Sequence, residues 1–593
     1  MNPETKVCQN CKQNFTVEPE DFDFYKKIDV PPPTFCPQCR LQRRLAFFNV
    51  FSLYKRPCDL CKKDFISAYK ADSPYIIYCP KCWWGDNWEV FEYGRDYDFS
   101  RPFFEQFKEL WLKTPILGIS VDIPTMETSP YINHGGHIKN CYLLFHVDYN
   151  QDSAYCFSAF NSNAIFDCSN LMFCELSYDL MHAYKTAHSI GSWDLNESIN
   201  CAFLRDSENC QDCFASANLK NKKYYIFNKP YSKEDYFNEI KKWDLGSYKT
   251  YREIKKLAQE HWKKFPPKPI YEKFNTNSNG NRIYESKNCK DSFDVAGVED
   301  SRYLMMMYQH STKDSYDISS WGYNMSRSYE CCNVGEDVSD ARFSNESGLG
   351  ATDIEYCKLS TGNHHFGCVS VKKGDYCIMN KRYSEEEYWK LREKIIVHMN
   401  EMPYISKATR DKSPASAKAS AGKQEAGELI YKYGEFFPVE LSPFAYNETI
   451  ANKFFPLTKD EALKNNYHWR DIELPSYQIT KYPKDLPDNI KDATDEILKE
   501  VVACADCNRG FRIVRMELDF LRRMNLPLPR ECPFCRIGKK FDEWVKESKL
   551  VKRICDKCGA EFESPHKKED YPFDFAQGKP KILCKKCWLK EVV

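Results

Sequence analysis

The chain has 593 residues, enough for several domains, and its 85 Lys and Arg residues balance 85 Asp and Glu residues. Net charge therefore gives no argument for nucleic acid or membrane binding, and any such argument has to be local. The sequence starts without the basic and then apolar pattern of a signal peptide, and no stretch approaches the roughly 18 apolar residues of a membrane helix. These features predict a cytoplasmic protein with no membrane partner, whose 29 cysteines are thiols or metal ligands and not disulfides.

Two groups of paired C-x-x-C motifs open the chain. Each group supplies four thiolates from two tight turns, which is the ligand set that Zn²⁺ takes at a closed tetrahedral site. The predicted ligands are Cys8, Cys11, Cys36 and Cys39 for a zinc ribbon at 1–50, and Cys58, Cys61, Cys79 and Cys82 for a second ribbon at 51–95. Buried free thiols and redox motifs are weaker alternatives because the paired spacing recurs, whereas iron suits four thiolates as well as zinc does.

A helical connector is expected at 96–130, and a repeat follows it. A short motif recurs, often every 12 to 15 residues: Asn or Asp, then Cys or Ser, then an aromatic or aliphatic residue. This pattern is typical of a parallel β-helix, or β-solenoid, in which small residues form inward ladders and Asn and Asp occupy the corners. We predict one half of the solenoid at 131–231 and a second half at 281–383.

The two halves end alike. A shift of 152 residues aligns 226–236 with 378–388, and in each copy a serine starts a capping box, Ser232 with Asp235 and Ser384 with Glu387. The sequence therefore predicts capping and linking helices at 232–280 and a capping helix at 384–402. A Ser/Ala/Lys-rich disordered linker at 403–427 and a Pro/aromatic-rich connector at 428–500 follow, the connector being read as a strap across the solenoid.

Other Cys and His residues in the repeat need a separate interpretation. Cys210 and Cys213 have metal-type spacing but no partner pair, so a packed thiol ladder is favoured over a metal site. The pairs His134/His137 and His364/His365 allow a metal or catalytic role, but solvated side chains are the more common reason for such pairs. Catalytic residues stay unknown, and no cofactor-binding motif is present.

The chain closes on two more groups of paired motifs. Cys504, Cys507, Cys532 and Cys535 predict a third zinc ribbon at 501–545, and Cys555, Cys558, Cys584 and Cys587 predict a fourth at 546–593. A shift of 496 residues aligns 8–40 with 504–536 without a gap. A tandem ribbon unit was therefore copied to both ends, and the cofactor prediction is four structural Zn²⁺ ions.

The run C-x-x-C-x3-F, an acidic stretch with Phe or Tyr, and P-x-x-C-P-x-C-R resembles the bacterial "probable zinc-ribbon domain" family. The resemblance covers about 35 residues at each end. It implies that the eight cysteines of the first and third ribbons are metal ligands, and it implies no reaction. The whole architecture is similar to that of bacterial proteins in which paired zinc ribbons bracket a Cys-rich repeat region.

The predicted fold class is a mainly β multidomain protein, with a two-part parallel β-solenoid flanked by tandem zinc ribbons. Three functions remain open: a scaffold that contacts nucleic acid, with RNA favoured; a scaffold for protein partners alone; and a β-helix enzyme acting on a polymer. Residues 504–593 carry 21 Lys and Arg against 14 Asp and Glu. The candidate phosphate contacts are Arg40, Arg43, Arg44, Lys55, Arg56, Lys539, Lys540, Lys552, Arg553, Lys581, Lys585 and Lys586, and the candidate stacking residues are Phe47, Phe48, Tyr54, Trp83, Trp84 and Trp588.

Overall fold

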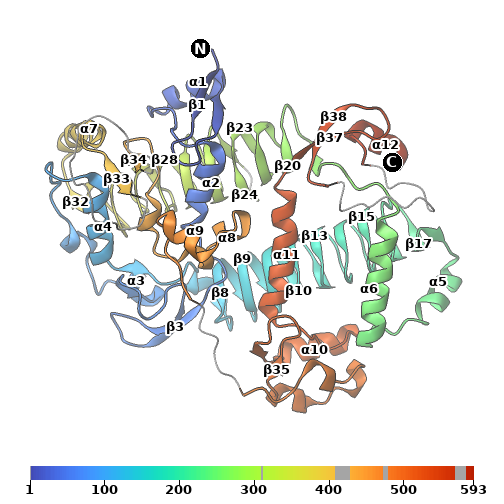
Figure 1. Ribbon diagram of the computed structural model, residues 1–593. Coiled ribbons are helices and arrows are strands. Elements are labelled where there is room, and N and C mark those ends of the chain that lie inside the picture. Colours follow the sequence, from blue (N-terminus) through green and yellow to red (C-terminus); the bar gives the residue numbers. More distant parts are fainter. Residues whose placement is uncertain (1, 309–310, 408–427, 472–477, 568–581, 593) are drawn as a thin grey trace. The chain divides into compact units, whose positions relative to one another are not determined.

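The computed structural model describes residues 2–308, 311–407, 428–471, 478–567 and 582–592 (Figure 1). Most of the predicted linker at 403–427, from residue 408 onward, lies outside these residues. The chain divides into two compact units, each made of two separated stretches. Unit 1 comprises Met1–Ile119 and Tyr271–Asp471, and unit 2 comprises Ser120–Ile270 and Ile472–Val593. Unit 1 therefore holds the second half of the solenoid and the N-terminal ribbon pair, and unit 2 holds the first half and the C-terminal ribbon pair.

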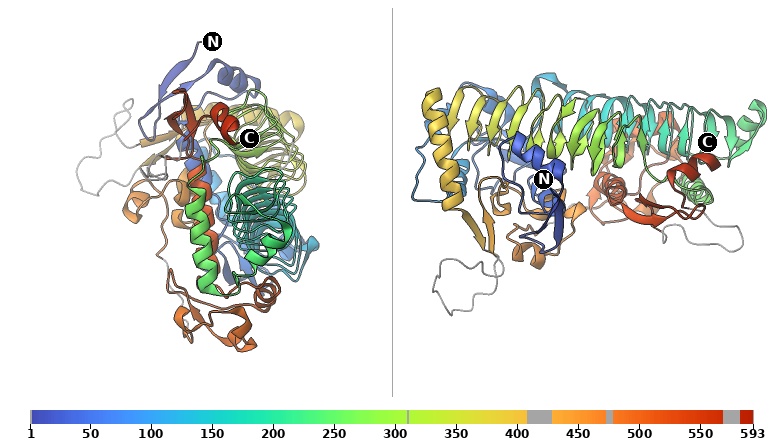
Figure 2. Two further views of the ribbon diagram at one scale, coloured as in Figure 1. Left: turned by 90° about the vertical axis from the view of Figure 1, so that its right-hand side faces the viewer. Right: turned by 90° about the horizontal axis from the view of Figure 1, so that it is seen from above.

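The solenoid of unit 2 is a regular stack of parallel coils, each twelve residues long. Tyr142 pairs with Ala154, Phe157 with Ser169, and the same offset continues through the stack. The ladder-like stacking of strands is visible in Figure 2. Its strands are β7 (Met126–Glu127), β8 (Ile132–Lys139), β9 (Tyr142–Gln151), β10 (Ala154–Phe166), β11 (Ser169–Met172), β12 (Glu175–Tyr178), β13 (Met181–Tyr184), β14 (Trp193–Asn196), β15 (Arg205–Glu208), β16 (Gln211–Phe214), β17 (Lys223–Ile226) and β18 (Lys229–Pro230).

The corners of these coils have a left-handed backbone. From His134 to Phe227 every third residue has a positive φ, so each coil turns at four such corners. Most L-residues lose about 1–2 kcal/mol in this conformation, whereas Asn and Asp tolerate it best. Corner side chains also bond from coil to coil: the Asn140 amide donates to the Asp152 carboxylate at 2.6 Å. The predicted place of Asn and Asp at the corners is therefore confirmed.

Small polar residues lie inside the coils beside Leu, Ile and Val, and they bond backbone groups of their own and of neighbouring coils. The hydroxyl of Ser153 accepts a hydrogen bond from the Ile165 amide of the next coil at 3.1 Å, and the Cys156 thiol donates to the Ala154 carbonyl at 3.2 Å. Because buried polar groups are costly when unpaired, these ladders stabilise the stack. The 13 cysteines outside the ribbons are all buried, and they form the inward ladders that the repeat predicts.

The solenoid of unit 1 is less regular. Successive coils are offset by 11 residues at Thr276 and Lys287, by 14 at Val298 and Thr312, and by 13 at Tyr316. Its strands are β19 (Glu272–Lys273), β20 (Gly280–Tyr284), β21 (Lys287–Lys290), β22 (Ser292–Ala296), β23 (Val298–Arg302), β24 (Met305–Met307), β25 (Thr312–Lys313), β26 (Tyr316–Trp321), β27 (Tyr329–Val334), β28 (Ser339–Arg342), β29 (Thr352–Glu355), β30 (Asn363–Phe366), β31 (Asp375–Ile378) and β32 (Lys381–Arg382). The first strand lies within 232–280, where the sequence predicts helices.

A helix follows each predicted capping box; at Ser232 the side chain accepts from the Asp235 amide, but the reciprocal bond of a full box is formed only at Ser384. In unit 2, α5 (Lys233–Ile240) begins after Ser232, and α6 (Tyr248–Trp262) follows. In unit 1, α7 (Glu385–Glu401) begins after Ser384, whose capping box with Glu387 has both hydrogen bonds. The predicted connector at 96–130 contains α4 (Phe103–Lys113). In the described parts of the chain no helix is both long and apolar enough to span a membrane.

The first part of the connector, 428–471, packs along the solenoid of unit 1. The Tyr433 hydroxyl donates to Glu355 at 2.7 Å, and the Phe436 amide donates to Glu330 at 2.9 Å. Its elements are β34 (Glu428–Tyr431), which pairs with β33 (Tyr404–Lys407), and the short helices α8 (Ala451–Phe454) and α9 (Lys459–Lys464). This stretch therefore acts as the predicted strap.

Candidate metal centres

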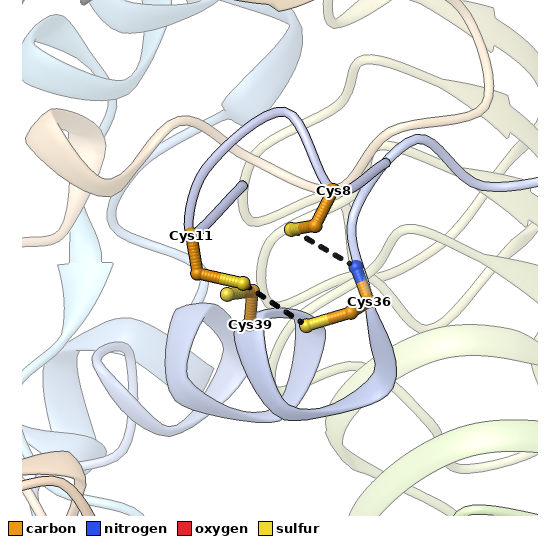
Figure 3. Close-up of side chains that lie close together, drawn as sticks. All are labelled: Cys8, Cys11, Cys36 and Cys39. Carbon is orange, nitrogen blue, oxygen red and sulfur yellow. Dashed lines mark hydrogen bonds between the residues drawn. The ribbon is translucent and has the colours of Figure 1, made fainter. Parts of the chain in front are cut away.

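All four predicted groups of thiols come together in space. Within each group the four sulfur atoms lie within 4.8 Å of one another. Sulfur atoms from the two turns of a group lie 3.7 Å apart in Cys11 and Cys36 (Figure 3), 4.0 Å in Cys61 and Cys79, 3.8 Å in Cys507 and Cys532, and 3.7 Å in Cys558 and Cys584. A tetrahedron with Zn–S bonds of about 2.3 Å has edges of about 3.8 Å. The spacing of the thiols therefore fits one tetrahedral ion per group.

The first turn of each group is built in the same way. In the first ribbon, Cys8 and Cys11 lie in the turn between β1 (Glu4–Val7) and β2 (Asn14–Val17). The residue after the second cysteine has a positive φ and its amide donates to the carbonyl of the first cysteine, as Lys12 does to Cys8 at 3.0 Å. The same backbone turn recurs at Lys62, Asn508 and Gly559. This turn directs both sulfur atoms of a C-x-x-C motif to one side.

The second turn of each group leads into a helix. Cys36 precedes α2 (Pro37–Leu45), Cys79 precedes α3 (Pro80–Trp84), Cys532 precedes α11 (Pro533–Glu547), and Cys584 precedes α12 (Lys585–Val592). Proline at the first helical position of α2, α3 and α11 has the fixed φ that a helix start needs. The positive end of each helix dipole therefore lies next to the thiols, which favours their ionised form.

Backbone amides also stabilise a thiolate in every group. The amide of the third cysteine donates to the sulfur of the first, at 3.2 Å from Cys36 to Cys8 and at 3.1 to 3.3 Å in the other ribbons. Burial opposes ionisation, but such amides outweigh it and lower the pKa of Cys58 and Cys504 to about 7. Hydrogen bonds from neighbouring thiols lower the pKa of Cys8 well below its usual range. Metal coordination requires this ionised form.

The remaining Cys and His candidates are packed or hydrogen-bonded within the solenoid. Cys210 and Cys213 are buried in an apolar cluster of the solenoid, and the hydrogen bond that Cys210 donates to Cys213, together with burial, raises the pKa of Cys210. His137 contacts Asp148 at 3.0 Å and stacks on a tyrosine ring of the next coil. His365 is buried, and its nitrogens bond to the Ser360 hydroxyl and a backbone carbonyl. Over the described residues, the only groups of side chains arranged to hold a metal are the four four-cysteine sets.

Helix α2, which follows the first centre, docks on the solenoid of unit 1 through buried charges. Arg40 donates to Asp317 at 3.0 Å, Arg44 bonds the same carboxylate at 2.9 Å, and Arg43 bonds Glu330 at 2.6 Å. Arg43 also contacts Glu435 of the strap at 3.0 Å, so three arginines meet three carboxylates. At most 2% of each arginine is exposed. These arginines therefore bind carboxylates of their own unit and do not face solvent.

The same arrangement recurs in unit 2 at positions shifted by 496. Arg536, which aligns with Arg40, bonds Glu517 at 2.9 Å and contacts Asp167. Lys540, which aligns with Arg44, contacts Asp179 in the solenoid. Helix α11 carries both residues and packs on β10 and β11. Each ribbon pair thus anchors its solenoid half through equivalent buried ion pairs.

Most candidate stacking residues are also internal. Phe47, Phe48, Trp83 and Trp588 are buried, and the indole of Trp588 donates to the Pro266 carbonyl at 3.1 Å. Trp84 is 47% exposed. Arg56 is buried against Asp59. Among the basic candidates, the exposed ones are Lys55, Lys539, Lys552, Lys585 and Lys586; Arg553 is half-buried, and Lys581 lies outside the described residues.

Comparisons with known proteins add little to this geometry. No family model matches the chain, and no curated protein matches it. One solved structure with local similarity is that of a "putative acetyltransferase" from Desulfovibrio desulfuricans G20. The two are 8% identical over 44% of this chain and 71% of that chain, with a TM-score of 0.10. A likeness of this size carries no conclusion about function.

Proposed function

We propose that the chain is a scaffold protein that holds four structural zinc ions and presents a β-solenoid to a macromolecular partner. The observation that carries the proposal is the fourfold recurrence of a closed four-cysteine centre with spacing for one tetrahedral ion. No position among the four thiols is left for a substrate, and a helix that follows a centre docks on the solenoid in each unit. The metal would fix the turn from which that helix starts.

Zinc removal tests this role. The protein is unfolded with chelator and reductant, and it is then refolded with and without zinc. We expect the zinc-free chain to show a lower Tm and faster amide exchange in the four ribbon hairpins, because structural zinc sites supply about 10–16 kcal/mol of binding free energy. Equal Tm and equal exchange in the two preparations would overturn the structural role. Restoration by iron but not by zinc would reassign the metal.

RNA is the first partner class that we propose, and the fourth ribbon is the surface that supports it. Lys552, Lys585 and Lys586 are exposed there, whereas the arginines of the first ribbon are used within unit 1. Lysines held on a rigid zinc ribbon neutralise RNA phosphates, which makes RNA binding depend on the salt concentration. Lys552 lies on β37 (Val551–Ile554) and Lys586 on α12, beside the fourth of the four-cysteine centres.

A labelled single-stranded RNA tests this partner by fluorescence anisotropy across a salt series. The double variant Lys552→Glu/Lys586→Glu should bind more weakly and reduce the salt slope by about 1.4, since each phosphate contact to single strands contributes about 0.7. Lys394→Glu, an exposed lysine on α7, is the control and should leave both quantities unchanged. Loss of binding in the control as well, or no binding by the unmodified chain, would contradict the RNA proposal.

A scaffold for protein partners alone is the alternative if RNA does not bind. In unit 2 the apolar side chains of Phe173 and Ile199 stay exposed on the solenoid, where a protein partner could contact them. For either partner class we propose a cytoplasmic setting, in which thiolate ligands stay reduced. No disulfide joins any of the 29 cysteines, which agrees with such a setting.

A further inference from the structure

The last coil of the unit 2 solenoid is strongly basic. Residues 213–233, here called the terminal coil, contain five lysines and no Asp or Glu. The terminal coil includes β17 and β18 and ends at the first residue of α5, at one end of the stack (Figure 1). A block of like charges of this kind is typical of a surface that binds a polyanion. The five lysines, all exposed, are Lys220, Lys222, Lys223, Lys229 and Lys233.

These lysines are not used by the fold of unit 2. In the described part of the chain none of the five forms an ion pair. Lys222 stands one coil after Cys210, at a position that faces the inside of the earlier coils. Because α5 begins before another coil reaches this position, the Lys222 side chain is exposed, and its ammonium lies over the Tyr225 ring at 5.8 Å from the centroid. Glu208 lies beside Lys220 in the preceding coil, so the excess of positive charge is greatest after Lys220.

The lysines of the equivalent coil in unit 1 have partners within the chain. Lys372, which aligns with Lys220 after the shift of 152 residues, donates to the Trp83 carbonyl at 2.6 Å. Lys381, in the hairpin that closes the same coil, forms an ion pair with Asp96. The end of the unit 1 stack therefore uses its lysines to hold the second ribbon and the segment that follows it.

Carboxylates replace two of the lysines in unit 1. The same shift aligns Lys223 with Asp375 and Lys233 with Glu385. A coil of this shape followed by a capping helix thus forms with either charge, and the repeat does not require the lysines of unit 2. We infer that their positive charge serves a contact outside the chain.

The fourth ribbon lies next to the terminal coil. The Pro266 carbonyl accepts a hydrogen bond from the Asn218 side chain at 3.0 Å and another from the Trp588 indole at 3.1 Å. Asn218 comes two residues before Lys220, and Trp588 comes two residues after Lys586 on α12. The basic surface of the fourth ribbon and that of the terminal coil are therefore neighbours within unit 2.

We propose that the terminal coil is a second RNA contact and that one single strand runs from the fourth ribbon onto it. This inference rests on the RNA-binding function proposed above. Each nucleotide brings one phosphate charge, and lysines without internal partners neutralise it at little cost. The half-buried rings of Tyr224 and Tyr225 lie between the lysines and offer stacking surfaces for bases. A strand held at one surface meets the neighbouring one at high effective concentration, so the two contacts reinforce each other.

The triple variant Lys220→Gln/Lys222→Gln/Lys223→Gln tests this contact by fluorescence anisotropy of a labelled single-stranded RNA across a salt series. It should bind more weakly than the unmodified full chain and reduce the salt slope by about 2.1, since each phosphate contact to single strands contributes about 0.7. Ultraviolet crosslinking of the same RNA to the unmodified chain, followed by peptide mapping, should place crosslinks in the terminal coil as well as in the fourth ribbon. This second measurement does not depend on how the variant folds.

Lys373→Gln/Lys390→Gln/Lys394→Gln is the charge-matched control, since these three lysines are exposed at the end of the unit 1 stack. It should leave the affinity and the salt slope unchanged. An unchanged slope in the terminal-coil variant, an equal loss in both triple variants, or crosslinks confined to the fourth ribbon would overturn the second contact while RNA binding itself stood. No RNA binding by the unmodified chain would overturn the second contact together with the RNA function.

Discussion

Cys36→Ser is expected to lower the metal content by one ion per chain and to release the first ribbon while the solenoid of unit 1 stays folded. Cys36 contributes one of the four ligands, and its backbone amide also bonds the Cys8 sulfur. Three thiolates and a hydroxyl hold zinc far more weakly than four thiolates do. Hydrogen exchange should show loss of protection in β1 and β2, whereas α2 keeps its protection because its arginines remain bonded to the solenoid.

Cys368→Ser is the matched control for this experiment. Cys368 is buried inside the solenoid, where its thiol donates to the Phe366 carbonyl, and a serine hydroxyl makes the same bond. The control should keep the full metal content and full protection of β1 and β2. If Cys36→Ser also kept both, Cys36 would not be a ligand. If it unfolded the coils of unit 1 as well, the ribbon and the solenoid would fold as one cooperative element.

Asp317→Asn is the second substitution with a large expected effect. Asp317 is fully buried and accepts from both Arg40 and Arg44, so the change leaves two buried cations with one carboxylate fewer. Removing one partner of a buried ion pair costs about 3–5 kcal/mol, whereas exposed pairs contribute about 1 kcal/mol or less. We expect a loss of this size in the free energy of unfolding of unit 1, measured by denaturant titration.

Two further substitutions are compared with Asp317→Asn, one at the equivalent buried ion pair of unit 2 and one at an exposed ion pair. Asp167→Asn should destabilise unit 2 in the same way, because Asp167 is buried against Arg536. Asp340→Asn breaks a surface pair with Arg327 and should change stability by no more than about 1 kcal/mol. Equal small effects of all three substitutions would show that the buried charges do not anchor the ribbons.

Local patterns in the sequence predicted the metal centres and the corners of the solenoid. Two cysteines separated by two residues can face one ion only if the backbone turns sharply between them, so the C-x-x-C spacing nearly fixes the geometry. Asn and Asp at the corners reflect a backbone preference of single residues, as at Asn140. The capping box at Ser384 likewise depends on four neighbouring residues. Each of these features is decided within a few positions of the chain.

The exchange of ribbon pairs between solenoid halves could not be predicted in this way. It depends on contacts such as that of Arg40 with Asp317, which are 277 residues apart. The acidic partners carry a weak repeat signal: Asp167 and Asp317 are 150 apart (317 − 167), while the capping boxes of the two halves are offset by 152 (384 − 232). The coils of unit 1 vary from 11 to 14 residues, so no single shift aligns the two solenoid halves.

Because such long-range contacts cannot be predicted from the sequence, the role of the basic residues of the first ribbon could not be predicted either. Counting Arg40, Arg43 and Arg44 indicates a positive helix, but it does not reveal which face of that helix meets carboxylates. Arginines spaced four apart on a helix are expected both where the helix binds phosphates and where it packs on buried carboxylates. The sequence alone does not separate these two cases. The signal that was present is that a 496-residue shift aligns Arg40 with Arg536 and Asp21 with Glu517. Arg536 bonds Glu517 directly, whereas Arg40 bonds Asp317 and Asp21 bonds Arg302, so each of these charges has a partner within its own unit.

Elemental analysis of protein purified without chelators, combined with native mass spectrometry, tests the central claim most directly. The four groups of four cysteines predict four zinc ions per chain, a mass shift that disappears on acidification because the thiolates are protonated and release the metal. A chain that carries no metal, with all sixteen of these cysteines reacting rapidly as free thiols while the ribbons stay folded, would contradict the account.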